Sequence, residues 1–325
     1  NYILLAIDVP KETEQSPQAV EQIFSILSAS RSTGTLYEQL WKGKTVDSFS
    51  FEIVSIGGYI QYLVRTPDYF RDLIEASVYA QYPDAEITQV EDYVQRIPLD
   101  FDSDTYDLWG TEFEMTKPDG FPIRTYPEFE NSLSGEFKDP MAGLLEVIGR
   151  IKQDEDVWLQ LVVTPTDDSW KAHAQHEVDA LLGAAHDSGG GIFNLFVKLI
   201  IDWPLKIVHD IGEFIIPLWG EVEEEQHETE MKKFSDLTQG EKIVIEAIQR
   251  KMAKIAFHVK FRMIYWGERE TFLKGRGVAP VVGAIQQFTT LDRNGWRPGK
   301  RVTTKAEYFL KSSRLNHKQR SILLS

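Results

Sequence analysis

Residues 49–65 read FSFEIVSIGGYIQYLVR, two alternating runs separated by a pair of glycines. Apolar side chains occupy every second position of the first run, beginning at Phe49, and the run from Tyr59 to Arg65 alternates in a similar way. A period of two is typical of strands that bury one face. Because Gly57-Gly58 readily adopts the backbone angles of a tight turn, the stretch predicts a β-hairpin.

Helical and extended segments flank this hairpin on both sides. Residues 2–9 are expected to form a strand and residues 17–28 an amphipathic helix. Downstream, Pro67 opens a second helix, and residues 85–93 form a further strand. The order βαββαβ over residues 1–97 predicts a ferredoxin-like sandwich, in which two helices cover one face of a four-stranded antiparallel sheet.

A second cycle of similar elements follows. The expected strands lie at 107–115, 157–164 and 255–266, and the expected helices at 140–151, 169–182, 238–254 and 269–288. We therefore predict an α+β chain of two ferredoxin-like (βαββαβ-type) sandwiches, at 1–97 and 98–290, the second interrupted by an amphipathic helical insertion at about 184–236. Residues 291–325 form a separate basic C-terminal segment.

Charge is distributed unevenly along the 325 residues, whose net charge is −15. Residues 1–250 hold 46 acidic and 19 basic residues, a net of −27, whereas residues 251–325 hold 4 and 16, a net of +12. The chain has no cysteine, which excludes disulfides, thiol nucleophiles and thiolate zinc sites. Asn1 leads directly into an apolar run, so we expect the sequence to be part of a longer chain.

The insertion carries a long, mostly apolar helical pattern over residues 192–219, with polar residues spaced by about one helical turn. Three interpretations stay open: a helical hairpin packed on its own domain, a helix in a membrane interface, or a helix buried between subunits. Its apolar residues are the candidates for a membrane or oligomer interface: Phe193, Phe196, Ile200, Trp203, Ile207, Ile211, Phe214 and Trp219.

Two fragments resemble chemical motifs without completing them. Gly43-Lys44-Thr45 has the end of a phosphate-binding P-loop, but the required earlier glycine is replaced by Glu38. His173, His176 and Glu177 share a predicted helix, and histidines at this spacing suit a divalent metal, but the order fits neither zincin motif and no third ligand is indicated. We therefore predict no catalytic residues, no cofactor and no metal centre, with this trio as the weak metal candidate.

Basic and aromatic residues alternate in the C-terminal segment, a composition that suits either nucleic acid or an acidic protein surface. Because of the acidic excess upstream, we favour contact with the chain's own body or with a protein partner over contact with nucleic acid. The residues concerned are Arg293, Arg297, Lys300, Arg301, Lys311, Arg314, Lys318 and Arg320.

Several segments also resemble an uncharacterised bacterial domain family of membrane-anchored proteins associated with type IV secretion and conjugative DNA transfer. The segments that carry the resemblance are WKGKT at 41–45, FEIVSI at 51–56, EASVYAQYPDAEI at 75–87, VEDY at 90–93, LWGTEF at 108–113, PIRTY at 122–126, KDPM at 138–141 and QQFT at 286–289. They span most of the chain outside the insertion.

The resemblance implies a transmembrane helix upstream and, downstream, a short tail or a VirD-like, FtsK/HerA-type motor ATPase. It implies a non-enzymatic scaffold or assembly domain at the cytoplasmic face of the bacterial inner membrane. Its expected partners are the motor ATPase or other secretion-machine subunits, and further copies of itself. The alternatives are a nucleic-acid-handling module that uses the basic C-terminal segment and a metal-dependent hydrolase around His173 and His176.

Overall fold

A computed structural model describes residues 1–10, 17–30, 46–97, 104–129, 139–184 and 237–299. The chain divides into two compact units. The sheet unit comprises Asn1–Asp168 and Ile255–Ser325, and the helical unit comprises Ser169–Lys254. The helical unit is therefore inserted into the chain of the sheet unit, between two of its strands.

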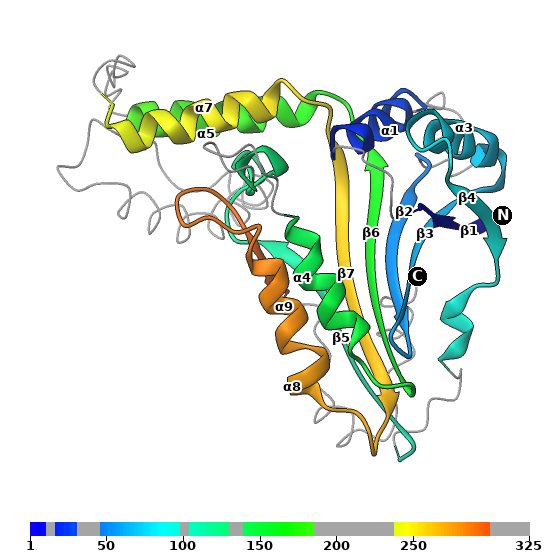
Figure 1. Cartoon of the computed structure of the whole chain (residues 1–325). Helices are drawn as coiled ribbons and strands as arrows, with labels where there is room; N and C mark the ends of the chain where they lie inside the picture. Colours follow the sequence, from blue (N-terminus) through cyan, green and yellow to red (C-terminus); the bar gives the residue numbers. More distant parts are fainter. Residues whose placement is uncertain (11–16, 31–45, 98–103, 130–138, 185–236, 300–325) are drawn as a thin grey trace, which may run out of the picture. The chain divides into compact units, whose positions relative to one another are not determined.

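One antiparallel sheet of eight strands forms the framework of the sheet unit (Figure 1). Its strands are β1 (Tyr2–Asp8), β2 (Phe49–Ile56), β3 (Tyr59–Pro67), β4 (Glu86–Val90), β5 (Tyr106–Met115), β6 (Glu155–Pro165), β7 (Phe257–Glu268) and β8 (Trp296–Pro298). The spatial order is β4-β1-β3-β2-β6-β7-β5-β8. The same sheet thus contains strands from both ends of the described sequence.

The predicted hairpin at residues 49–65 is confirmed. Strands β2 and β3 pair antiparallel, from Ser50↔Arg65 to Ile56↔Tyr59 at the turn. Gly57 and Gly58 have φ angles of 57° and 86°, in the region that side chains other than glycine rarely adopt. The turn therefore depends on the glycine pair, as the sequence indicated.

The prediction of two ferredoxin-like sandwiches is wrong. Strand β2 pairs with β6 along its whole length, from Phe49↔Val163 to Ile56↔Asp156. The edge strand of the first predicted sandwich is therefore hydrogen-bonded to the edge strand of the second, and one continuous sheet results. Alternation of side chains reports which face of a strand is buried, but it says nothing about whether an edge is paired, because edge pairing uses backbone groups.

Helices cover one face of the sheet in two pairs, α1 with α3 and α4 with α9 (Figure 1). The helices of the sheet unit are α1 (Pro17–Ala29), α3 (Arg71–Gln81), α4 (Pro140–Gly149), α8 (Lys274–Gly277) and α9 (Ala279–Gln286), with 3₁₀ turns η1 (Asp68–Phe70), η2 (Tyr93–Arg96) and η3 (Tyr126–Phe129). The helix expected at 269–288 is shorter and divided, since Pro280 lies in the first turn of α9, where it begins a helix rather than continuing one.

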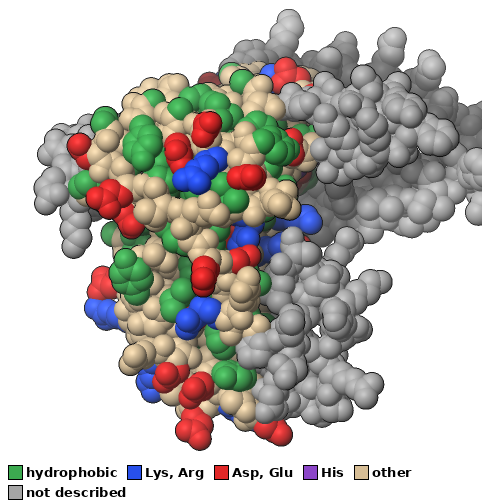
Figure 2. All heavy atoms as spheres, turned by 90° about the vertical axis from the view of Figure 1, so that its right-hand side faces the viewer, with side chains coloured by type: hydrophobic (Ala, Val, Ile, Leu, Met, Phe, Trp, Pro, Cys, Tyr) green, Lys and Arg blue, Asp and Glu red, His purple; other side chains and the backbone are tan. Residues whose placement is uncertain are grey.

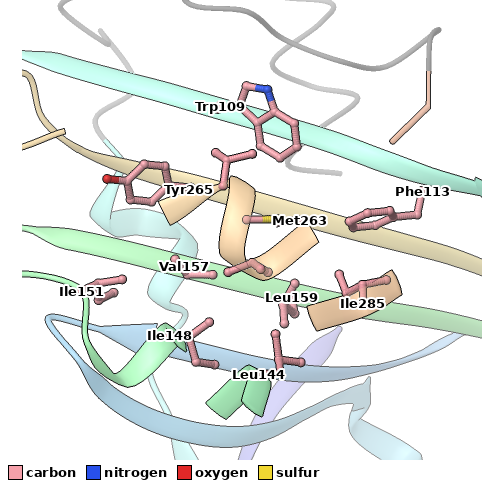
Figure 3. Packing of buried hydrophobic residues seen from close by; sticks show 12 residues of the cluster. Trp109, Phe113, Leu144, Ile148, Ile151, Val157, Leu159, Met263, Tyr265 and Ile285 are labelled. Atoms are coloured by element: carbon pink, nitrogen blue, oxygen red, sulfur yellow. The ribbon is translucent and has the colours of Figure 1, made fainter. Parts of the chain in front are cut away.

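The α4–α9 pair packs on the strands through a dense apolar cluster (Figure 3). Leu144 and Ile148 of α4 and Ile285 of α9 meet Leu159 of β6 and Met263 of β7. These five side chains are at most 3% exposed, so the cluster removes nearly all of their apolar surface from water. A similar cluster beneath α1 and α3 contains Leu5, Leu27 and Ile74.

The opposite face of the sheet is called the η2 face here, because the turn η2 and the residue after it pack on it. Tyr93 and Ile97 contact an apolar cluster that contains Trp158 of β6 and Trp266 of β7. The rings of Tyr93 and Trp158 meet edge to face, with centroids 4.7 Å apart. This face carries the polar residues described below.

The helical unit consists, in its described part, of α5 (Ser169–Ala184) and α7 (Gln239–Met252), which contact each other. A capping box starts α7, with Thr238 and Glu241 each bonded to the other's backbone N–H. Ile245 and Ile248 of α7 are buried. The predicted apolar helix at 192–219 and the eight interface candidates on it lie outside the described residues. No helix within the described ranges is long and apolar enough to cross a membrane.

Candidate functional site

A row of polar side chains crosses the centre of the η2 face at one level. Glu52 of β2 is opposite Gln160 of β6, Gln160 is opposite Arg262 of β7, and Arg262 is opposite Glu112 of β5. Each strand supplies one residue, and the strict register of antiparallel pairing aligns the four. We call Glu52, Gln160, Arg262 and Glu112 the polar row.

The polar row is largely removed from water. Glu52 is 3%, Arg262 6% and Gln160 8% exposed. Burying charged or amide groups is unfavourable unless hydrogen bonds replace the lost water. The hydrogen bonds of these three residues therefore show how far their burial is compensated.

Arg65 of β3 joins the Glu52 end of the row to the segment after β4. Its guanidinium binds Asp92 through two parallel hydrogen bonds of 2.8 and 2.9 Å, and its Nε donates to Glu52 Oε1 at 3.2 Å. The hydrogen bond from Arg65 holds the pKa of Asp92 below its usual value. A carboxylate with a lowered proton affinity is a weak general base, so this end of the row is suited to holding structure together.

Tyr93 connects Glu52 to Gln160. Its hydroxyl donates to Glu52 and accepts a hydrogen bond of 2.8 Å from Gln160 Nε2. Burial, and then the neighbouring charge of Glu52, raise the pKa of Tyr93 well above its usual value. The hydroxyl therefore stays protonated and keeps its role as a donor.

Arg262 anchors the other end of the row. Its Nε donates to Glu112 Oε1 at 3.1 Å, and the backbone carbonyl of Glu112 accepts from Gly299 N at 2.7 Å. Further along the same edge, Arg297 of β8 lies 3.9 Å from a carboxylate oxygen of Glu114. Strand β8 is thus attached beside the row by backbone and charge contacts.

Asp156 forms a second buried acidic position on the η2 face. It is 1% exposed and accepts a 3.0 Å hydrogen bond from Arg96 Nε. Burial raises its pKa, while Arg96 and the nearby indole groups of Trp158 and Trp266 favour the charged form. Neither buried indole N–H has a partner at ordinary hydrogen-bond geometry within the described structure. Ionised Asp156 is therefore less well stabilised than Asp92.

The predicted metal candidates lie on α5. His173 and His176 are exposed, and Glu177 is buried. In the part of the chain that the structure describes, no group of three or more histidine, aspartate or glutamate side chains is placed to hold a metal ion. The P-loop-like fragment at 43–45 lies outside the described residues.

The structure describes two of the eight basic candidates in the C-terminal segment. Arg293 is bonded to Glu128, and Arg297 is close to Glu114, so both face acidic groups of the chain itself. In the view of Figure 2, acidic, basic and apolar side chains are interspersed over the described surface. The other six candidates fall in the range 300–325, outside the described residues: Lys300, Arg301, Lys311, Arg314, Lys318 and Arg320.

Sequence reasoning missed the polar row, although a signal was present. Glu52, Gln160 and Arg262 each lie near the middle of a strand, between two apolar or aromatic neighbours in the sequence. A charged or amide residue at such a position is enclosed when the strand lies in the interior of a sheet. Without knowledge that β2, β6 and β7 are neighbours, the three could not be recognised as one cluster.

Comparison with known proteins gives one assignment. No curated protein matches the chain significantly. The model of a family described as a domain of unknown function, DUF8128, matches residues 4–292. This range includes β2 to β7 and therefore the whole polar row, and by this match the chain belongs to the DUF8128 family.

Proposed function

We propose that the chain is a non-enzymatic scaffold or assembly domain of a membrane-anchored, type IV secretion-like or conjugative DNA-transfer machine. The supporting observation is that its buried and half-buried charged side chains form ion pairs between distant segments. Arg65 joins β3 to the segment after β4, and Arg276 joins α8 to Glu155 at the start of β6. Such pairs fix distant segments against one another, as a rigid assembly platform requires.

The location and partners of this scaffold follow from the sequence resemblance. The domain would face the cytoplasm at the bacterial inner membrane, tethered by a segment upstream. Its partners would be a motor ATPase or other secretion-machine subunits, together with further copies of the same chain. A continuous eight-stranded sheet supports this role because backbone hydrogen bonds join all its strands into one framework on which partners can assemble.

Affinity purification from the native bacterium tests the proposal. A tagged copy is purified from detergent-solubilised membranes, and co-purifying proteins are identified by mass spectrometry. We expect motor ATPase subunits to co-purify with the wild-type tagged copy. Their recovery should fall when the tagged copy lacks residues 1–299. A complementing Gly275→Ala copy should restore recovery, because nothing lies within 4 Å of a Cβ atom at that position.

ATP hydrolysis by the purified chain gives the contradicting result. If the chain hydrolyses ATP, and a point substitution within it abolishes the reaction without unfolding it, the domain is an enzyme. Recovery of the same motor subunits with and without residues 1–299 would also remove the scaffold role.

A further inference from the structure

Arg262 makes few hydrogen bonds for a buried guanidinium. The residue is 6% exposed, and its hydrogen bond within the described structure is the one from Nε to Glu112. The two Nη atoms find no acceptor among the described residues. They are also not among the fully enclosed unpartnered atoms, which include Ser50 Oγ and Trp158 Nε1. The Nη edge of Arg262 therefore has no acceptor among the described residues and keeps a small contact with solvent.

Gln160 lies directly opposite Arg262 and has spare hydrogen-bonding capacity as well. It is 8% exposed and donates to Tyr93 from Nε2, while Oε1 has no donor among the described residues and is not fully enclosed. Cross-strand partners in an antiparallel sheet have Cβ atoms about 4.5–5.5 Å apart. The unused groups of Arg262 and Gln160 thus belong to one small area on the η2 face.

These unused groups require a physical explanation. A guanidinium has five N–H donors, and leaving most of them without acceptors in a poorly hydrated position is unfavourable. Glu112 occupies Nε, so the Nη pair presents two parallel donors, the geometry that matches the two oxygens of a carboxylate. The arrangement therefore suits an incoming acidic group that completes the coordination of Arg262.

The charges around Arg262 distinguish between kinds of anion. Glu112 pairs with Arg262 directly, and Glu52 lies two strands away in the same row. A phosphate dianion would be repelled by these carboxylates more strongly than a singly charged carboxylate. The excess of acids in residues 1–250 likewise opposes the approach of a nucleic-acid backbone. A carboxylate from a protein segment is the better match.

We propose that Arg262 and Gln160 form a docking site for a glutamate or aspartate side chain of an acidic partner segment. Arg262 binds the carboxylate through its Nη edge. The Oε1 atom of Gln160 accepts a hydrogen bond from a donor group of the partner segment next to that carboxylate. The site deepens the scaffold proposal by naming the chemistry of one partner contact, and it rests on that proposal only in taking the ligand to be a protein.

Fluorescence anisotropy with the complete chain tests the site, using a labelled oligoglutamate peptide as the probe. We expect the wild-type chain to bind this peptide in preference to an oligoglutamine peptide of equal length. Arg262→Lys keeps the charge but loses the paired donors, and it should weaken binding about tenfold. Gln160→Met is similar in volume without the amide and should weaken binding to a smaller extent.

Arg150→Gln is the control, because Arg150 follows α4 on the opposite face of the sheet and its side chain is 76% exposed. Its affinity for the peptide should stay within about twofold of wild type. Near-ultraviolet circular dichroism of the aromatic side chains, which include the fully buried Trp158, shows whether each variant is folded. A second position, Gln160, keeps the test decisive if the Arg262 variant unfolds.

Three results would overturn the docking site. The folded wild-type chain could show no preference for oligoglutamate, or Arg262→Lys and Arg150→Gln could weaken binding equally. A phosphopeptide or a short oligonucleotide could also compete more strongly than unlabelled oligoglutamate. None of these results affects the recovery of motor subunits from membranes. Failure of the docking site and failure of the scaffold role are therefore separable.

Discussion

Gly277 lies so close to the ring of Tyr265 that a Cβ atom at position 277 would be 2.3 Å from the ring carbon Cζ. The same ring stacks on Phe272 with centroids 4.5 Å apart, and its hydroxyl donates to buried Glu155 at 2.9 Å. The ring thus has little room to move. Helix α8 can lie this close to β7 because Gly277 has no side chain.

Replacing Gly277 by alanine should therefore destabilise the sheet unit. The added methyl group must displace the ring or the helix, and overpacking of this kind costs about 1–3 kcal/mol. Gly275→Ala in the same short helix is the control, because nothing lies within 4 Å of its Cβ position. Urea unfolding of both variants measures the difference, and equal midpoints would show that Tyr265 yields without strain.

Asp92→Asn should lower stability at neutral pH and have little effect in acid. The substitution removes the charge that Arg65 binds, but asparagine still accepts from Val94 N, as Asp92 does at the start of η2. A carboxyl whose folded pKa is lowered stabilises the fold above its unfolded pKa, about 3.9, and that contribution is lost as the pH falls through the folded pKa. We expect a loss of about 1–2 kcal/mol near neutral pH, discounted for partial exposure.

Asp156→Asn is the matched comparison, since burial raises the pKa of Asp156 instead. A carboxyl with a raised folded pKa disfavours the folded state at neutral pH, and this penalty disappears as the pH falls through that pKa. The substitution should leave stability at neutral pH unchanged or slightly higher. Thermal unfolding across the acidic range measures both variants, and a loss of equal size and pH dependence in the two would contradict the assignment of causes.

Asn294→Asp should destabilise the loop that follows β5. Asn294 is fully buried, its Nδ2 donates to the carbonyl groups of Lys117, Pro118 and Phe121, and its Oδ1 accepts from backbone N–H groups. Aspartate has the same shape but places an oxygen against the three carbonyl oxygens. We expect a loss of about 3 kcal/mol in urea unfolding, partly recovered at low pH by protonation. Wild-type stability at neutral pH would contradict these contacts.

Thr238→Ala should loosen the helical unit and leave the sheet unit unchanged. The hydroxyl of Thr238 accepts from Glu241 N at 3.3 Å, and an N-cap of this type contributes about 1 kcal/mol. Thr238→Ser keeps the hydroxyl and is the control. Amide hydrogen exchange should accelerate in α7 but not in β2 or β3. Equal acceleration in both would mean that the two units unfold together.

Much of the secondary structure was accessible from the sequence because its causes are local. The turn at Gly57-Gly58 follows from glycine's backbone freedom, and the start of α7 follows from the Thr238–Glu241 pairing. The prediction of separate sandwiches failed at the pairing of β2 with β6. That pairing joins backbone groups about one hundred residues apart, and no local pattern encodes it.

The candidate site was less accessible for the same reason. The predicted metal trio was chosen by spacing along one helix, where neighbours are fixed by helical geometry. The polar row instead combines residues from four strands, with Arg262 and Glu112 lying 150 positions apart in sequence. Only the order of the strands brings such residues to one level of the sheet.

The sequence by itself determined most of the described strands and helices, where the tight turn lies, and how charge divides between residues 1–250 and 251–325. These properties depend on side-chain type and on neighbours a few residues away. The tertiary structure decided that the strands form one sheet and that Gln160 stands beside Arg262. Both depend on backbone hydrogen bonds between distant strands, which are chemically alike at every position and acquire their register only when the whole sheet is assembled.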